Sequence, residues 1–342
     1  MLNFKSPKAL VFALIIIYNL LAASTVSSQG QLQVGFYSKT CPNAESIVRS
    51  VIQKTFERDP GSAAVLLRLQ FHDCYVEGCD ASILIDNGEE GERKASGNLG
   101  VGGFEIIEEA KAKLEGICPG VVSCADIVAL AARDGVALVK GPFYEVPTGR
   151  RDGKVSSKSL ADNLPEVDDS IQLLKSKFRQ KGLSDRDLVL LIGVLFPGGH
   201  TIGLTACFFM QARLYNFTPG GGSDPAINPE FLKQLKSKCP FQGDPNIRIP
   251  LDPVTDFIFD DQIFFNIKNG FAVIASDARL YDDENTKRIL ESYVSSAVGN
   301  SSSSGSLPSF KADFAKAMVK MGNLGVKTGS EGEIRRVCAA VN

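Results

Sequence analysis

Histidine is scarce in this chain: only His72 and His200 occur among its 342 residues. Imidazole titrates near neutral pH and is the most frequent metal ligand, and with only two histidines there is no further one to be mistaken for a functional residue. His72 lies in the run Leu66–Cys74, four residues after Arg68, and on a helix this spacing puts both side chains on one face. A cation beside a neutral base is suited to a small substrate in which positive and negative charge separate during the reaction. Taken singly, His72 could be a buried structural histidine and Arg68 a surface arginine. These structural roles do not account for the whole run Leu66–Cys74.

A basic excess is absent as well. The formal net charge is −2, so neither a nucleic acid nor an anionic membrane surface is an expected partner. An exposed heptad pattern is also absent, and we therefore expect a monomer.

Long apolar runs are absent beyond the start of the chain. There, two lysines precede the apolar run Ala9–Ala22, which is shorter than the ~20 residues that a membrane-spanning helix needs. This pattern predicts a signal peptide over residues 1–28, although cleavage after Gly30 fits nearly as well. Residues 29–342 would then form a secreted, extracellular protein. About 310 residues are enough for one large domain or two smaller ones.

Cysteine, in contrast, is well represented, with eight residues that all lie beyond the apolar run. In an oxidising compartment they predict four disulfides, but the spacing leaves roughly a hundred pairings open. The sequons at Asn216 and Asn300 predict glycosylation, which agrees with secretion, although such triplets also occur by chance.

Alternating strand patterns and internal repeats are absent, whereas helical periodicity is frequent. Phe310, Phe314, Ala317, Met318 and Met321 form one apolar stripe at helical spacing. Ser184 is a plausible N-cap for a helix that starts at Asp185. Similar patterns predict helices over Ala44–Glu57, Phe104–Glu115, Ala125–Leu138, Ser170–Phe178, Pro229–Ser237 and Glu284–Ala297. The expected fold is mostly α: one all-helical domain in two lobes, with a site between them.

Oxygen-bearing side chains cluster just after His72. Asp73, Asp80 and Ser82 surround Gly78, and hard oxygen ligands in a short loop suit Ca²⁺. The loop lacks the alternating acidic pattern of an EF-hand, and a disulfide between Cys74 and Cys79 would close it. An ordinary acidic turn explains the segment about equally well when it is taken alone.

A second oxygen cluster comes much later, with Thr201 beside the second histidine, followed by Asp252, Thr255 and Asp260. Such residues are common in loops, so composition alone favours no site. Asp277 could orient a ligating histidine through its other ring nitrogen, but no spacing requires that pairing.

Together these motifs resemble the secreted plant haem peroxidases of class III. The run Arg68–Cys74 is similar to the distal signature of that family, and Gly199–Gly203 is similar to the proximal one. The likeness extends from Gln31 to Asn342. It includes Phe36-Tyr37, Cys118-Pro119, Val122-Ser123-Cys124-Ala125-Asp126, Gly149-Arg150-Arg151-Asp152, Arg213-Leu214-Tyr215-Asn216 and Gly332-Glu333-Ile334-Arg335-Arg336.

The resemblance implies a role for each matching residue. His72 would be the distal acid-base, Arg68 its charge-stabilising partner and Asn98 the acceptor that orients it, with Phe71 beside them. His200 would be the axial ligand of haem b, supported by Asp277. Glu92 would link the distal network to calcium, and Pro165 would contact an aromatic substrate.

The implied calcium ligands are Asp73, Val76, Gly78, Asp80 and Ser82 at the distal site, and Thr201, Asp252, Thr255, Ile258 and Asp260 at the proximal site. The implied disulfides are Cys41–Cys118, Cys74–Cys79, Cys124–Cys338 and Cys207–Cys239.

The implied activity is oxidation of small phenolic donors by hydrogen peroxide. Neutral His72 would take a proton from the peroxide and return it to the departing oxygen, while Arg68 offsets the developing negative charge. An iron-oxo state would then remove one electron from each of two donors. A Cys/His metal hydrolase is a weak alternative, because paired cysteines in a secreted chain are better explained as disulfides.

Two features depart from the family pattern. Gly102 stands where the family usually has an arginine, and we expect little effect on chemistry. More seriously, residues 194–198 intervene where Gly193 should lead directly into Gly199. Five extra residues in a continuous helix would rotate His200 by roughly 140° and advance it by about 7.5 Å, away from iron. Pro197 favours a bulged loop instead, which would keep His200 in place. The alternative is an inactive or haem-poor, calcium-binding secreted relative.

Overall fold

The helix that carries His72 is buried on almost every side, and the rest of the fold is arranged around it. The computed structural model describes residues 31–191, 200–299 and 308–342. In it, helix α3 (Ser62–Tyr75) exposes only Val65 to an intermediate degree, and its other residues are buried. A helix that is buried on all its faces lies in the core, and its polar side chains, such as Arg68 and His72, therefore need partners there.

The elements are mostly helical, as the sequence predicts. Within the described ranges the α-helices are α2 (Ala44–Arg58), α3, α4 (Phe104–Glu115), α5 (Cys124–Leu138), α6 (Ile171–Gln180), α7 (Asp185–Leu191), α8 (Gln211–Tyr215), α9 (Pro229–Lys238), α10 (Gln262–Lys268), α11 (Ala275–Arg279), α12 (Glu284–Ala297) and α13 (Phe310–Met321). Short 3-10 helices include η2 (Ser82–Leu84), η4 (Glu92–Lys94), η5 (Ser96–Asn98) and η6 (Lys158–Ala161). No helix in these ranges is both long and apolar enough to cross a membrane.

The predicted helix boundaries are close to the observed ones, and a capping side chain accepts a backbone N–H at the start of α5, α6, α9 and α12. α4 and α12 have the predicted bounds, and the others differ by one or two residues. Ser184 caps α7 as predicted: its hydroxyl accepts the backbone N–H of Asp187 at 3.2 Å. The Asp187 carboxylate in turn accepts the backbone N–H of Ser184 at 2.7 Å. This reciprocal pair is the capping-box arrangement.

One short sheet corrects the expectation of an entirely helical domain. Strand β1 (Leu204–Ala206) pairs antiparallel with β2 (Arg248–Pro250), with Thr205 opposite Ile249. Three residues are too few to show an alternating pattern in the sequence, so the pair could not be recognised there.

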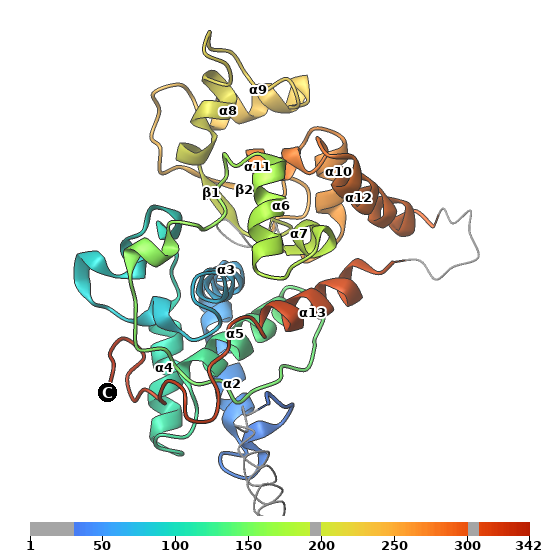
Figure 1. The fold of residues 1–342 in the computed structure, drawn as a ribbon. Helices are drawn as coiled ribbons and strands as arrows, with labels where there is room; N and C mark the ends of the chain where they lie inside the picture. The colour runs from blue at the N-terminus through green and yellow to red at the C-terminus, as the bar shows by residue number, and fades with distance from the viewer. Residues whose placement is uncertain (1–30, 192–199, 300–307) are drawn as a thin grey trace, which may run out of the picture. The chain divides into compact units, whose positions relative to one another are not determined.

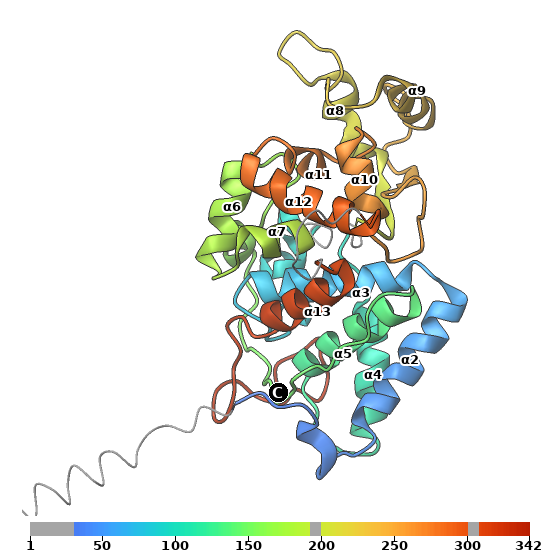
Figure 2. The same ribbon diagram turned by 90° about the vertical axis from the view of Figure 1, so that its right-hand side faces the viewer.

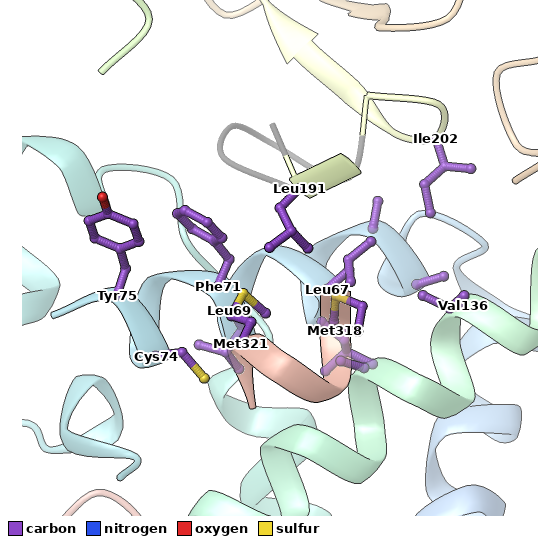
Figure 3. Packing of buried hydrophobic residues seen from close by; sticks show 14 of the residues in the cluster. Leu67, Leu69, Phe71, Cys74, Tyr75, Val136, Leu191, Ile202, Met318 and Met321 are labelled. Atoms are coloured by element: carbon purple, nitrogen blue, oxygen red, sulfur yellow. The ribbon is translucent and has the colours of Figure 1, made fainter. Parts of the chain in front are cut away.

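The helices pack in two groups around α3. Helices α2, α4 and α5 contact one another, and α5 and α2 contact α3; α7 contacts α6, α12 and α13 in the second group. In Figures 1 and 2, helices α6, α7 and α12 lie on one side of α3 and helices α4 and α5 on the other, with α13 beside α3. Figure 3 shows the core there, where Leu67 and Phe71 of α3 lie with Leu191, Ile202 and Met318 from later parts of the chain.

Four disulfides staple this core, and all four pairings match the implied ones. They are Cys41–Cys118, Cys74–Cys79, Cys124–Cys338 and Cys207–Cys239. Cys124–Cys338 joins the first residue of α5 to the C-terminal segment across 214 positions of sequence. Residues Leu32–Asn342 form one compact unit.

Candidate active site

His72 sits in a buried hydrogen-bond chain near the end of α3. Its Nδ1 lies 2.7 Å from Oδ1 of Asn98, at the end of η5. The amide nitrogen of Asn98 donates to the backbone carbonyl of Glu92 at 2.8 Å, so the amide oxygen must face the histidine. Nδ1 of His72 therefore carries the proton, and Nε2 is left as the acceptor. His72 is held as a neutral base.

Arg68 lies one turn before His72, as the four-residue spacing predicts. Its Nε donates to Nε2 of His72 at 3.1 Å, and its Nη2 donates to the carbonyl of Leu99 at 3.1 Å. Burial, with a smaller contribution from the charge of Arg248, lowers the pKa of Arg68 to about 9. Nη1 is buried without a hydrogen-bond partner in the described part of the chain. The guanidinium of Arg68 therefore has one N–H donor, at Nη1, that is available beside His72.

Phe71 fills the space next to this pair. Its ring meets the His72 ring edge-on, with centroids 5.9 Å apart, and stacks on Tyr75 at 5.2 Å. Tyr75 in turn contacts Phe178 of α6. These aromatic contacts fix the rotamer of Phe71 and make the surroundings of His72 apolar.

His200 is completely buried, and its Nδ1 contacts Oδ1 of Asp277 in a short hydrogen bond. Asp277 lies in the first turn of α11 and is also completely buried. A carboxylate at one ring nitrogen leaves the other nitrogen as the lone-pair donor and makes the imidazole a stronger ligand. This arrangement is the one expected of an axial histidine.

The loop after His72 collects buried oxygen atoms. Asp73 accepts the backbone N–H of Ala81 at 3.0 Å, and Asp80 accepts that of Ser82 at 3.0 Å. Oδ1 of Asp73, Oγ of Ser82 and both carboxylate oxygens of Glu92 are buried without a hydrogen-bond partner among the described residues. Burial raises the pKa of Asp73 well above its usual range and that of Glu92 to about 8. Such a cluster is stable as anions only with a cation.

The five implied proximal ligands also come together. Thr201 Oγ1 donates to the carbonyl of Asp260 at 2.8 Å and lies 3.4 Å from that of Ile258. Thr255 donates to the Asp260 carboxylate at 3.1 Å, and Asp252 accepts the N–H of Thr255 at 2.9 Å. Burial and the charge of Asp252 raise the pKa of Asp260. Oδ2 of Asp252 has no hydrogen-bond partner within the described ranges.

These donor sets fit the groups that the resemblance implies. Across the described residues no cluster of three or more His, Cys, Asp or Glu has the arrangement of a metal site. A calcium site does not require one, because Ca²⁺ accepts hydroxyl and backbone carbonyl oxygens beside one or two carboxylates. The unsatisfied oxygens near Asp73 and Asp252 meet that description. His200, held by Asp277, meets the description of a haem ligand.

The positions of the remaining expected residues give less support for their implied roles. Glu92 reaches the His72 network through its backbone carbonyl rather than its carboxylate. Pro165 is buried in the segment after η6, so its contact with a donor remains a prediction. Asn216 is exposed, as a glycosylated residue has to be. Asn300 and the insertion at 194–198 lie outside the described residues.

Two lysines in contact with the distal loop were missed by sequence reasoning. Lys327 contacts the Asp80 carboxylate, and Lys181 Nζ donates to the Val76 carbonyl at 2.6 Å. Neither belongs to a recognisable motif, and both lie more than a hundred positions from the loop in sequence. Only the folded chain could have revealed them.

Comparison with known proteins identifies the class. The family profile described as "Peroxidase" matches residues 48–296, a range that includes both histidines and every implied ligand. The chain is thus a peroxidase. It is 62% identical to Peroxidase 13 of Arabidopsis thaliana over 316 residues, which cover 92% of this chain and 94% of that protein.

Two further relatives show to which family of peroxidases the chain belongs. Peroxidase 43 of Arabidopsis thaliana is 58% identical over 320 residues, covering 92% of this chain and 94% of the relative. Peroxidase N1 of Nicotiana tabacum is 46% identical over 333 residues, covering 96% and 97%. The chain belongs to the class III plant peroxidase family. It is accordingly an oxidoreductase that uses hydrogen peroxide, and membership implies haem.

Proposed function

We propose that this chain is a secreted, monomeric haem b peroxidase whose reducing substrates are small phenols. In one cycle hydrogen peroxide takes up two electrons and two protons and becomes two molecules of water. Two phenols each lose one electron and one proton and leave as phenoxyl radicals. The observation that carries this proposal is the buried chain Arg68–His72–Asn98, which holds a neutral base beside a cation.

The distal residues would manage the protons of the peroxide. Once Nε2 of His72 is released from its hydrogen bond with Arg68 Nε, it accepts a proton from the bound peroxide and returns it to the oxygen that leaves as water. Asn98 accepts from Nδ1 throughout, so the ring keeps its orientation in both protonation states. Arg68 can turn its unpaired Nη1 toward the oxygen on which negative charge develops. Phe71 keeps the surroundings apolar, which strengthens both interactions.

The proximal residues would hold the haem. When bound, haem b supplies the electrons that reduce the peroxide and recovers them singly from the donors. His200 would bind the iron through Nε2, because Asp277 occupies Nδ1. The Asp277 carboxylate gives the imidazole imidazolate character and so strengthens its donation to the metal.

Two calcium ions would hold these elements in position. The distal site would use Asp73, Val76, Gly78, Asp80 and Ser82, and the proximal site Thr201, Asp252, Thr255, Ile258 and Asp260. Asp73 follows His72 directly, and Thr201 follows His200 directly, so each ion would fix the backbone next to one histidine. We place a contact with the phenol at Pro165.

Absorption spectroscopy and donor stoichiometry test this proposal. The secreted protein should show a Soret band with one haem per chain, and should form two phenoxyl radicals for each peroxide consumed. The competing function, a haem-poor calcium-binding relative, is favoured by the insertion at 194–198 before His200. A protein that carries calcium but shows no Soret band, even after incubation with haem, would support that alternative.

A further inference from the structure

We propose that Lys327 is a built-in counter-ion of the distal calcium site. Its ammonium group would weaken calcium binding while holding the Asp80 carboxylate in place whenever the ion is absent. This inference rests on the proposed calcium site in the loop that follows His72, and concerns how that site is regulated.

The backbone of the segment Leu324–Lys327 lies against the loop that follows His72 and so positions Lys327 beside it. The N–H of Cys79 donates to the carbonyl of Leu324 at 2.9 Å, and the N–H of Arg151 donates to the carbonyl of Lys327 at 2.8 Å. A Cβ on Gly78 would lie 2.5 Å from the carbonyl oxygen of Gly325, so only glycine permits this approach. The C-terminal segment is therefore fixed to the loop before any side chain is considered.

The side chain of Lys327 contacts one particular oxygen of the Asp80 carboxylate. Nζ of Lys327 pairs with Oδ2 of Asp80, while the other oxygen, Oδ1, accepts the N–H of Ser82. The Asp80 side chain is 2% exposed and that of Lys327 is 30% exposed, so the pair lies at the edge of the buried cluster. A Cβ on Gly153 would lie 2.3 Å from Oδ2, so this oxygen is enclosed on that side as well. Lys327 thus occupies Oδ2 and leaves Oδ1 facing the loop.

Other cations lie against the same loop. Lys181 donates to the carbonyl of Val76, an implied ligand, and Arg335 Nη2 donates to the carbonyl of Ala81 at 2.6 Å. Lys181 faces Glu77 and Arg335 faces Asp152, so among the described residues Lys327 is the cation that pairs directly with a carboxylate of the implied ligand set. Calcium affinity follows the net charge of the ligands, so this site should bind more weakly than its acidic residues suggest. Buried carboxylates without any cation would destabilise the fold, and Lys327 prevents this when calcium leaves.

This role predicts two effects of opposite sign. Replacing Lys327 with methionine removes a positive charge beside Asp80, so calcium should bind about 10-fold more tightly, in line with the dependence of affinity on ligand charge. The same change leaves Asp80 unpaired in calcium-free protein, which should melt at a lower temperature. A lysine that served only to support the loop would weaken both calcium binding and stability when removed.

Calcium titration of the full-length, haem-loaded protein tests the inference. Dissociation constants are measured by competition with a fluorescent chelator for wild type, K327M and K327R, and melting temperatures are recorded with and without calcium. An Asp252→Asn background confines the measurement to the distal site. K327R keeps the charge and should resemble wild type, whereas K327M should bind more tightly and melt lower without calcium. K233M changes an exposed lysine whose ion pair within the described ranges is with Glu230, and should alter neither property.

Each outcome decides the question. An unchanged or weaker affinity in K327M, with wild type binding calcium normally, would overturn the role of Lys327 alone. A distal site that binds no calcium in wild type would overturn both the proposed site and this inference. If K327M does not fold in calcium-free buffer, the affinity of K327Q, measured from the calcium-loaded state, replaces it.

Discussion

Oδ1 of Asn98 lies 2.7 Å from Nδ1 of His72, while Nδ2 of the same amide donates to the Glu92 carbonyl. Because the second hydrogen bond fixes which end of the amide faces the ring, the neutral histidine carries its proton at Nδ1 and leaves Nε2 to act as the base. The tautomer of the proposed base is therefore set by a backbone carbonyl six residues before Asn98.

Loss of the base should be specific to the peroxide step. In His72→Ala we expect haem to remain bound while the rate of reaction with peroxide falls by at least ~10², the usual contribution of a general acid-base. Stopped-flow absorbance with excess peroxide measures this rate, and the resting Soret band controls for haem content. A near-normal rate would refute the assignment.

Loss of the orienting amide should have a smaller effect. In Asn98→Leu the His72 ring loses the acceptor at Nδ1, and we expect the peroxide rate to fall by about 10-fold to 100-fold, as when other partners of a functional imidazole are removed. Asn98→Asp retains an acceptor and should recover much of the rate. Equal rates in the leucine and aspartate variants would show that the amide plays no orienting part.

Removal of calcium should lower both stability and activity. An ion that binds only the folded state stabilises it by about 4 kcal/mol when its concentration is 1,000 times the dissociation constant. Calorimetry before and after chelation should therefore show a lower melting temperature, and re-addition of calcium should restore it. No change in melting temperature on chelation would argue against both sites.

Asp283 offers a test through acid stability. The Lys175 ammonium, together with backbone N–H donors of α12, lowers the pKa of Asp283 below its ordinary value. A carboxylate with a lowered pKa contributes stability above its unfolded pKa and loses it as pH falls through the folded value. Asp283→Ala should cost about 2 kcal/mol at neutral pH, about half from the lost N-cap.

Urea unfolding of wild type and Asp283→Ala at several pH values measures this difference. It should shrink steadily below about pH 4, where the unfolded carboxylate takes up a proton. A difference that stays constant with pH would assign the effect to packing rather than charge.

The insertion at 194–198 can be tested by deletion. Pro197 disfavours a continuous helix by ~3 kcal/mol, so we expect a bulge that keeps His200 near the iron but loosens it. Deletion of the five residues should change haem affinity little and should raise turnover. Equal haem occupancy and equal turnover in the two proteins would contradict this expectation.

The sequence predicted the helices well and the site only through the family resemblance. Helix α4 could be predicted because its apolar residues repeat at helical spacing, and α7 because Ser184 marks its start. His72 and Arg68 share one helix, so their proximity follows from spacing alone. His200 and Asp277 are 77 positions apart, and no local pattern could have paired them.

Contacts between distant segments account for what the sequence could not reveal. The strands β1 and β2 consist of three residues each and exist because the fold brings them together. The buried pair Arg150 and Asp126 lies within recognisable motifs, but its 2.7 Å ion pair depends on the packing of α5 against the following loop. Neither local propensity nor periodicity contains this information.

The contact between Asp80 and Lys327 spans 247 positions of sequence, and the disulfide Cys124–Cys338 spans 214. A chain emerging from the ribosome presents the distal loop early, but its C-terminal partners are made last. The loop beside His72 can therefore be completed only after synthesis of the whole protein has almost finished. A chain that still lacks its last residues can form the Cys74–Cys79 disulfide but has no Lys327 beside Asp80, so the surroundings of the distal loop are completed at the very end of synthesis.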